Sequence, residues 1–275
     1  MAYNLLKGKR GIIFGALNEL SIAWKVAERA HEEGAKIVLT NTPVSIRLGT
    51  ISTLAEQCGA VVIPADATSV EELENLVDKA MEVLGGKIDF VLHSIGMSPN
   101  VRKRIPYENI DYNNMMKTID ISAVSFHKLL QTLYKKDAMA EYGSVVALSY
   151  IAAQRSVAGY GDMADAKAML ESITRSFGAI FGRERKVRVN TVSQSPTLTT
   201  AGQGIAGLGD WFKLADELSP LGNASADDCA DYVVALFSDL TRKVTMQNLY
   251  HDGGFSQTAI CPSVIEAYER GKNKE

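Results

Sequence analysis

The segment from Tyr150 to Lys167 carries the side chains that could do chemistry. Tyr160 and Lys167 are seven residues apart, so on a helix they would share one face, about 10.5 Å apart along the axis, with Met163 and Ala164 between them. The lysine could hydrogen-bond the ribose hydroxyls of a nicotinamide cofactor while the tyrosine hydroxyl reaches a substrate carbonyl oxygen. The positive charge of the lysine would also stabilise negative charge that develops on that carbonyl oxygen. In isolation such a pair is more often a buried ring and a solvated lysine, so the surrounding elements decide the assignment.

Those elements alternate between short apolar runs and longer amphipathic stretches. Strands are predicted at residues 11–14, 36–40, 60–63, 88–93, 144–148, 187–192 and 247–251, and helices at 21–34, 47–58, 70–84, 113–136, 162–182 and 227–240. Alternating strands and helices are typical of an α/β protein with a parallel sheet covered on both faces. Since no repeat or linker interrupts the pattern, we predict a single doubly wound Rossmann-type domain over residues 1–275.

The turn after the first strand could bind the pyrophosphate of a dinucleotide. Gly15 closes that strand, and Ser21 can act as the N-cap of the next helix, with a hydroxyl where a phosphate would lie. The segment has one glycine and not the three of the common dinucleotide motif. The prediction of a pyrophosphate site therefore rests on the position of this segment after the first strand and not on its glycine content.

Two later strand ends also have side chains suited to a cofactor. Asp66 and Ala67 follow the third strand, where a short polar residue can reach an adenine edge, and residues Ser94, Ile95 and Gly96 follow the fourth. The glycine there permits close approach of a cofactor. The second strand ends without the acidic residue that would contact the ribose, so this position does not distinguish NADH from NADPH. Arg47 is the candidate for a 2′-phosphate, but an arginine that opens a helix is more often solvated, so NADH is favoured and NADPH stays open.

Length and composition narrow the class of protein. The chain has 275 residues, 46% of them hydrophobic, and a formal net charge of −3. These values fit a sizeable core and exclude a polybasic nucleic-acid binder. No apolar run approaches the roughly 18 to 20 residues of a membrane helix, so we expect neither nucleic acid nor membrane as a partner. Cys58, Cys229 and Cys261 are not spaced as disulfide or metal pairs, which favours a cytoplasmic location and no metal site.

Residues 193–209 form a long segment rich in glycine, serine and threonine after a predicted buried strand. Ligands of an open α/β sheet bind at the carboxyl ends of its strands. We therefore predict a substrate-binding lid around residues 195–215. The alternative is an ordinary surface connection, which its length disfavours.

Motifs along most of the chain resemble those of the enoyl-acyl-carrier-protein reductases of bacterial type II fatty-acid synthesis, a divergent branch of the short-chain dehydrogenase/reductase superfamily. The matching positions are Gly15 with residues 20–23, then 93–96, 120–122 with 125–126, 148–150, Tyr160 with Lys167, 187–190 and 251–256. The most discriminating feature is the spacer of six residues between Tyr160 and Lys167, because ordinary members of the superfamily use three.

The resemblance implies a reaction in which hydride passes from C4 of the nicotinamide to the β-carbon of a trans-2-enoyl thioester, giving an enolate that is then protonated. Tyr160 would hydrogen-bond the thioester oxygen, and Lys167 would hold the cofactor ribose. Tyr150 matches a second active-site tyrosine that lines the acyl site, and Ser98 matches a substrate position. The cofactor-binding residues implied in the same way are Ser21 and Ile22 at the first helix, Thr42, Asp66 and Ala67 around the adenosine, and Thr197, Leu198, Thr199, Thr200 and Ala201 against the nicotinamide and pyrophosphate.

The resemblance also implies partners, namely an acyl carrier protein that carries the enoyl thioester and a homotetramer to which the segment ending at residues 252–254 contributes. Two departures stand out. Ser195-Pro196 replaces the usual Gly-Pro before the lid, and the lid has only Lys213 where a basic cluster would meet an acidic carrier protein. The basic run Arg102, Lys103 and Arg104 is a candidate replacement, although basic residues in a loop are usually only solvated.

Two other functions fit the same residues. A carbonyl or hydroxyl oxidoreductase would use the same cofactor and the same tyrosine and lysine. A binding protein that senses the cofactor without catalysis would need only the cleft, and the presence of Tyr150, Tyr160 and Lys167 together argues against it.

Overall fold

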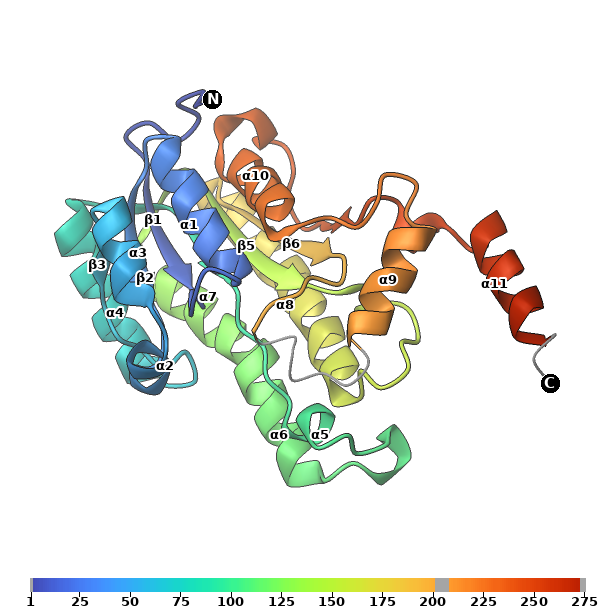
Figure 1. Ribbon diagram of the computed structural model, residues 1–275. Helices are drawn as coiled ribbons and strands as arrows, with labels where there is room; N and C mark the ends of the chain where they lie inside the picture. The colour runs from blue at the N-terminus through green and yellow to red at the C-terminus, as the bar shows by residue number, and fades with distance from the viewer. Residues whose placement is uncertain (1, 201–207, 273–275) are drawn as a thin grey trace.

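The structure is a computed structural model that describes residues 2–200 and 208–272 (Figure 1). Its centre is a seven-stranded parallel sheet in the order β3-β2-β1-β4-β5-β6-β7. The strands are β1 (Arg10–Phe14), β2 (Lys36–Thr40), β3 (Val61–Val62), β4 (Ile88–His93), β5 (Met139–Ser149), β6 (Arg188–Gln194) and β7 (Asn248–His251). The predicted α/β class with a doubly wound parallel sheet is confirmed.

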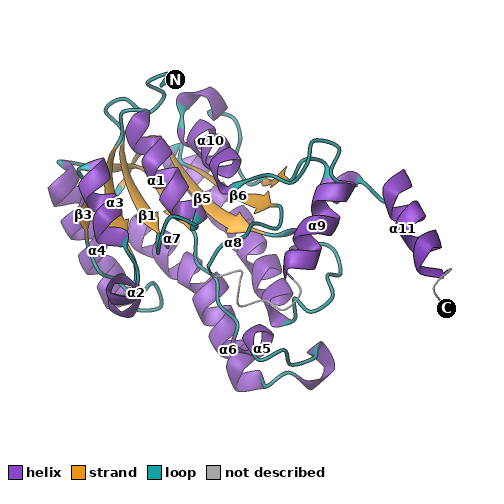
Figure 2. Cartoon of the chain, viewed as in Figure 1, coloured by secondary structure: helices purple, strands orange, loops and turns teal. Residues whose placement is uncertain are grey.

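Helices cover both faces of the sheet (Figure 2). The helices are α1 (Ile22–Glu32), α2 (Pro43–Leu48), α3 (Ile51–Cys58), α4 (Val70–Leu84), α5 (Pro99–Arg102), α6 (Tyr112–Ile119), α7 (Ser125–Lys135), α8 (Asp162–Arg185), α9 (Leu208–Leu218), α10 (Ala226–Phe237) and α11 (Pro262–Lys272). Buried side chains of α1, α3 and α10 pack on one face, and those of α4, α7 and α8 pack on the other. The central strands β1, β4 and β6 are mostly buried, because helices cover the sheet on both faces.

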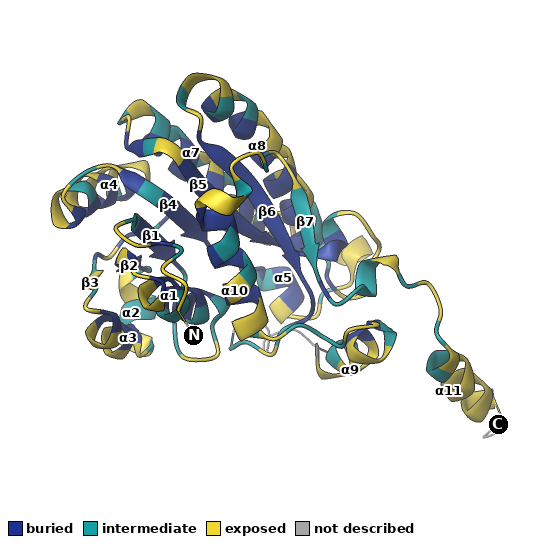
Figure 3. Cartoon of the chain, turned by 90° about the horizontal axis from the view of Figure 1, so that it is seen from above, coloured by how far each residue is buried: buried dark blue, intermediate teal, exposed yellow. Residues whose placement is uncertain are grey.

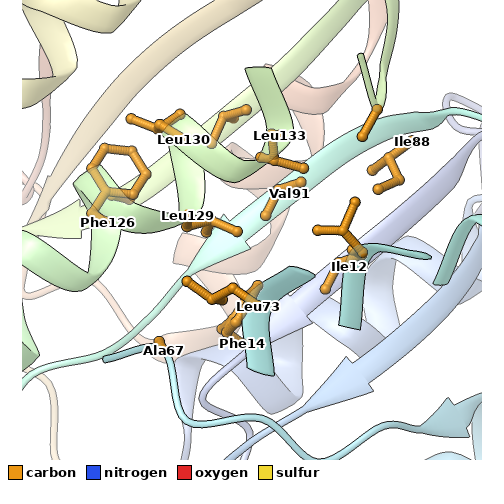
Figure 4. Close-up of a cluster of buried hydrophobic side chains, with 14 of the residues drawn as sticks. Ile12, Phe14, Ala67, Leu73, Ile88, Val91, Phe126, Leu129, Leu130 and Leu133 are labelled. Carbon is orange, nitrogen blue, oxygen red and sulfur yellow. The ribbon is translucent and has the colours of Figure 1, made fainter. Parts of the chain in front are cut away.

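The core on the α4–α7–α8 face shows how the apolar runs are used (Figure 4). Ile12 of β1 and Val91 of β4 are neighbours in the sheet and fully buried. Leu73 of α4 and Phe126 of α7 pack over them in the same cluster. Burial of each such side chain contributes about 1.5–3 kcal/mol, so this face fixes the strands whose ends carry the cofactor-binding loops.

Two of the predicted helices are interrupted. The helix predicted over residues 47–58 is two helices, α2 and α3, because Gly49 is extended and a Cβ there would lie 2.3 Å from the backbone oxygen of Leu17. The helix predicted over residues 113–136 is α6 and α7 with a π-helical turn, Asp120–Val124, between them. A π-helical turn contains one residue more than an α-helical turn, and the hydrophobic periodicity of the sequence does not reveal that residue.

Other elements were not predicted at all. These are α5, α9 and α11, while β5 begins at Met139 and not at residue 144. Helix α11 extends from the body of the molecule and has no buried side chains, whereas the strands at the centre of the sheet are mostly buried (Figure 3). None of the helices in the described part of the chain is long and apolar enough to cross a membrane.

The strand order reverses between β1 and β4, which are neighbours in the sheet although two strands separate them in sequence. Helix α1, after β1, packs on one face, and α7, which follows β4, packs on the other. A crevice forms at the carboxyl ends of strands at such a reversal, and ligands of doubly wound sheets bind there.

Candidate active site

The carboxyl ends of the central strands open into a cleft of about 640 Å³. Most residues predicted to bind cofactor or substrate line it, namely Gly15, Ser21, Ile22, Thr42, Asp66, Ala67, Ser94, Ile95, Gly96, Ser98, Tyr150, Tyr160, Lys167, Thr197, Thr199 and Thr200. Leu198 does not line it and is 47% exposed, and Ala201 lies outside the described residues. The cleft therefore gathers side chains from distant parts of the chain at the strand-order reversal.

Gly15 ends β1 in a conformation that requires glycine. Its φ is +96°, and a Cβ would lie 2.0 Å from the backbone oxygen of Ser94. The first amides of α1 follow this turn and have no partner within the helix, so they can bind an anion such as a pyrophosphate. Ser21 is the N-cap residue, as predicted, but its hydroxyl accepts hydrogen bonds from the amides of Leu17 and Asn18, at 3.1 and 3.2 Å. It stabilises the turn instead of capping the helix.

Polar side chains that follow β2 and β3 also line the cleft. The Thr42 hydroxyl accepts from the Ser45 amide at 3.2 Å and so caps α2. The Asp66 carboxylate accepts from the amide and the hydroxyl of Thr68, both at 2.8 Å. Arg47 is exposed on α2 and is not one of the residues that line the cleft. This part of the cleft therefore offers hydroxyls and one carboxylate to a ligand.

Tyr160 and Lys167 both line the cleft, but the prediction that they share a helical face is wrong. Helix α8 begins at Asp162, two residues after the tyrosine. Gly161 has φ +52° and ψ −140°, a conformation outside the helical region that glycine adopts readily. The Tyr160 ring instead packs against Tyr150, with 4.8 Å between ring centroids. A break in the chain, and not helical periodicity, brings the phenol and the ammonium into one site.

Burial sets the protonation of these groups. It raises the pKa of Tyr160 well above its usual value, with a smaller contribution from Tyr150, whose own pKa burial raises to about 12. Burial lowers the pKa of Lys167 to about 8, against the charge of Glu171, which raises it. The Lys167 ammonium donates to the backbone oxygen of Leu148 at 2.7 Å. At neutral pH the site therefore holds two protonated phenols and one ammonium.

The end of β4 forms an uncharged floor beside the lysine. His93 is fully buried, and burial followed by the charge of Lys167 lowers its pKa to about 3. Its Nε2 lies 2.9 Å from the hydroxyl oxygen of Ser125. A Cβ on Gly96 would lie 3.3 Å from Cε of Met163, so glycine keeps the cleft open here. Within the described residues, no group of three or more His, Cys, Asp or Glu side chains could hold a metal ion.

The hydroxyl of Ser98, predicted at a substrate position, is already engaged in hydrogen bonds. It donates to Asp162 Oδ1 at 2.6 Å and accepts from the amide of Val101 at 3.0 Å. Asn100 and Thr118 donate to the other oxygen of Asp162, both at 2.9 Å. This buried carboxylate at the start of α8 thereby holds the segment after β4 and helix α6. Ser98 lines the cleft as part of that framework.

The start of the predicted lid is fixed to the rest of the molecule. The Ser195 hydroxyl accepts from the Ala224 amide at 3.2 Å, a bond that the glycine usual at this position could not make. The side-chain amide of Asn18 donates to the Thr200 hydroxyl at 2.8 Å, which joins this segment to the turn after β1. Residues 201–207 of the lid lie outside the described residues, and α9 follows them.

Several residues of the site were not predicted from the sequence. Trp211 of α9 lines the cleft, with its ring 6.5 Å from that of Tyr160, and Gln194 lines it at the end of β6. A lone tryptophan within the predicted lid was a signal that could have been used. Asp162 and Glu171 carry no such signal, because charged residues on a helix are usually solvated.

The fold and the cleft together define a Rossmann-type dinucleotide-binding protein with a tyrosine–lysine pair, a short-chain dehydrogenase/reductase in class. Comparisons with known proteins narrow this class. Residues 15–256 match the sequence pattern of the family described as enoyl-(acyl carrier protein) reductase. The chain therefore belongs to the enoyl-(acyl carrier protein) reductase family.

Individual relatives agree with this family. The chain is 32% identical to an enoyl-[acyl-carrier-protein] reductase [NADH] of Rhizobium meliloti, over 93% of this chain and 94% of that protein. A crystal structure of a FabI-NADH complex from Alistipes finegoldii is 71% identical, with a TM-score of 0.93, and the match covers 94% of this chain and 91% of that one. A second FabI structure from the same organism is 68% identical with a TM-score of 0.94, over 98% of each chain.

Proposed function

We propose that Tyr160, Tyr150 and Lys167 carry the reaction of this NADH-dependent enoyl-(acyl carrier protein) reductase, an oxidoreductase of fatty-acid biosynthesis. The observation that carries the proposal is their convergence in one buried cleft at the strand-order reversal. The substrate is a trans-2-enoyl thioester, whose double bond is reduced at the β-carbon.

The Tyr160 hydroxyl donates a hydrogen bond to the thioester oxygen. Because burial raises its pKa, the phenol keeps its proton and stabilises the enolate by donation, without becoming an anion itself. Tyr150 lines the acyl side and packs against the Tyr160 ring. The Lys167 ammonium adds positive charge to the same site, where low polarity strengthens its effect on developing negative charge.

The residues of the cleft fit NADH. A Cβ on Gly15 would fill the space beside Ser94, and the amides of α1 that follow can bind a pyrophosphate. Thr42 and Asp66 border the adenosine end, and Lys167 is available to the nicotinamide ribose. When bound, NADH supplies the hydride. The exposed position of Arg47, outside the cleft lining, supports the preference for NADH over NADPH.

The basic run Arg102, Lys103 and Arg104 is the docking site for acyl carrier protein in this proposal. Arg102 borders the cleft, and all three side chains are exposed. An acidic carrier would be steered to a basic rim, with its thioester directed into the cleft. Replacing all three by alanine should raise KM for an acyl carrier protein substrate and leave KM for a crotonyl thioester of coenzyme A unchanged. Equal KM values for the carrier substrate in variant and wild type would contradict this docking site.

The chain is also proposed to be a homotetramer in the cytoplasm. Exposed apolar side chains on α8, Met169 and Ile180, border a groove against α7 that suits a subunit contact. The three cysteines are free thiols, which suits a reducing compartment. Sedimentation of the purified protein tests the assembly, and a monomer at assay concentration would contradict it.

Absorbance at 340 nm tests the reaction itself, with crotonyl thioester and NADH or NADPH offered separately. We expect oxidation of NADH that depends on the thioester. Tyr160→Phe should lower kcat with little change in KM for NADH, and the Tyr150→Phe, Tyr160→Phe double variant should lose turnover. Wild-type turnover in the double variant would refute the assignment. Activity on ketones alone would favour a carbonyl oxidoreductase, and cofactor binding without any turnover would favour a sensor.

A further inference from the structure

Glu171 is a buried carboxylate that the reaction above does not use. It lies on α8 one helical turn after Lys167 and is 4% exposed. Its Oε1 accepts a hydrogen bond from the Ser149 hydroxyl at 2.7 Å, and its Oε2 accepts from Nε2 of Gln154 at 2.8 Å. Both oxygens are thus engaged by donors from another part of the chain, and a buried acidic group needs such partners.

The two donors flank the turn that carries Tyr150. Ser149 ends β5 directly before the tyrosine, and Gln154 follows the 3₁₀ turn Ile151–Ala153. Glu171 therefore holds the turn at both ends. Lys167 holds the preceding residue from the same helix through the backbone oxygen of Leu148. The path of the chain around Tyr150 is thus fixed to α8.

The orientation of Gln154 extends this network. Because its Nε2 donates to the carboxylate, its Oε1 is left to accept from the Tyr250 hydroxyl of β7, at 2.7 Å. A carboxylate has no proton to donate, so Glu171 fixes the direction of every hydrogen bond in the series. Replacing it with an amide would present one donor where an acceptor is needed.

We propose that Glu171 is a positioning residue of the reductase site, which holds the Tyr150 turn against α8 so that the rings of Tyr150 and Tyr160 keep their packing. The inference rests on the proposed roles of the two tyrosines. The carboxylate also lies close enough to Lys167 to raise its pKa against burial, so one side chain serves both the tyrosines and the lysine.

Three variants test the hydrogen bonds. Glu171→Gln turns one acceptor into a donor, and Gln154→Glu sets two carboxylates against each other. The double variant exchanges the two side chains. In it the amide at 171 accepts from Ser149 and donates to the carboxylate at 154, which accepts from Tyr250, so each hydrogen bond has a partner again. We expect each single variant to lose about tenfold in kcat with crotonyl thioester, with KM for NADH changed less than about threefold, and the double variant to recover kcat to within about threefold of wild type.

Glu33 provides the matched control. It is also a buried carboxylate, but it accepts hydrogen bonds from the amides of Tyr3 and Leu5 and is not one of the residues that line the cleft. Glu33→Gln should lower the melting temperature, because it breaks the ion pair of the carboxylate with Arg29 at 2.8 Å. It should leave kcat unchanged, because Glu33 does not line the cleft.

Wild-type kcat in folded Glu171→Gln would overturn the inference, and so would a folded double variant that recovers nothing. If Glu171→Gln fails to fold, the double variant decides alone, since it restores the hydrogen bonds. Failure of the proposed function is a separate result. It would appear as wild-type turnover in the Tyr150→Phe, Tyr160→Phe variant, whatever the outcome at residue 171.

Discussion

Lys167→Met should make the protein inactive and, at neutral pH, more stable. The lysine is 6% exposed, and its aliphatic stem is close in size to that of methionine. The substitution removes the ammonium from the site, so we expect binding of NADH to be lost. It also removes the free-energy cost of burying the ammonium. The difference in stability between the variant and wild type then measures that cost.

The magnitude follows from the pKa of the ammonium. Burial lowers it from 10.5 to about 8, and each pH unit of that difference is worth about 1.4 kcal/mol. At pH 7 the charged lysine thus lowers the free energy of unfolding by about 3 kcal/mol. Its hydrogen bond to the Leu148 oxygen offsets about 2 kcal/mol of this. The variant should therefore be about 1 kcal/mol more stable than wild type at pH 7.

The pH dependence has a definite sign. Because the folded pKa lies below the unfolded one, the unfolded chain binds more protons between pH 8 and pH 10.5, and wild-type stability rises with pH across this window. From pH 7 to pH 9.5 the lysine contributes a gain of about 2 kcal/mol, which the variant lacks. The order of stability should therefore reverse, with wild type about 1 kcal/mol ahead at pH 9.5.

Urea unfolding of both proteins at the two pH values measures this difference, and groups common to both cancel. NADH binding is followed in parallel by cofactor fluorescence. A difference in stability that does not change between pH 7 and pH 9.5 would refute the reasoning, because it would mean that Lys167 titrates near its ordinary value. NADH binding of wild-type strength in the variant would refute the role of the ammonium.

Three further predictions concern other parts of the cleft. Gly15→Ala should raise the Kd for NADH more than about tenfold, because the added Cβ would meet the Ser94 oxygen at 2.0 Å; fluorescence titration measures this, and an unchanged Kd would contradict it. Arg47→Ala should leave the ratio of kcat/KM for NADH and NADPH unchanged, since the side chain is exposed outside the cleft lining; a selective loss with NADPH would show that Arg47 contacts the 2′-phosphate. Asp162→Asn should lower the free energy of unfolding by about 2 kcal/mol. The new amide group would place a donor against the donors of Ser98, Asn100 or Thr118. An unfolding midpoint at the same urea concentration as wild type would contradict this prediction.

The sequence predicted the sheet and the location of the cleft well, since both depend on apolar periodicity and on the order of strands. Two of its errors lie at glycines where the chain leaves helical geometry. The extended Gly49 separates α2 from α3, and Gly161 keeps Tyr160 outside α8, although the start of that helix at residue 162 was predicted correctly. Such breaks depend on contacts between distant segments, for example Gly49 with Leu17, and these contacts leave no local pattern.

The charged residues of α8 show a second limit. Lys167 and Glu171 are four residues apart, a spacing that in sequence is typical of an exposed ion pair on a helix. In the structure both are buried, and each bonds to the segment around Tyr150 and not to solvent. Their burial could be recognised only once β5 was known to lie beside α8.

Asp162, Lys167 and Glu171 together interrupt the face that α8 turns inward, where its other buried side chains are mostly apolar. Apolar residues at these positions would avoid the desolvation of three charged groups. Burial without full neutralisation is what lowers the pKa of Lys167, and it is also what makes the ammonium effective toward a developing negative charge. The helix therefore gives up stability at the positions where the site requires charge. Methionine at position 167 should therefore stabilise the fold at neutral pH. Methionine at position 171 should not, because only that change leaves buried donors, Ser149 and Gln154, without an acceptor.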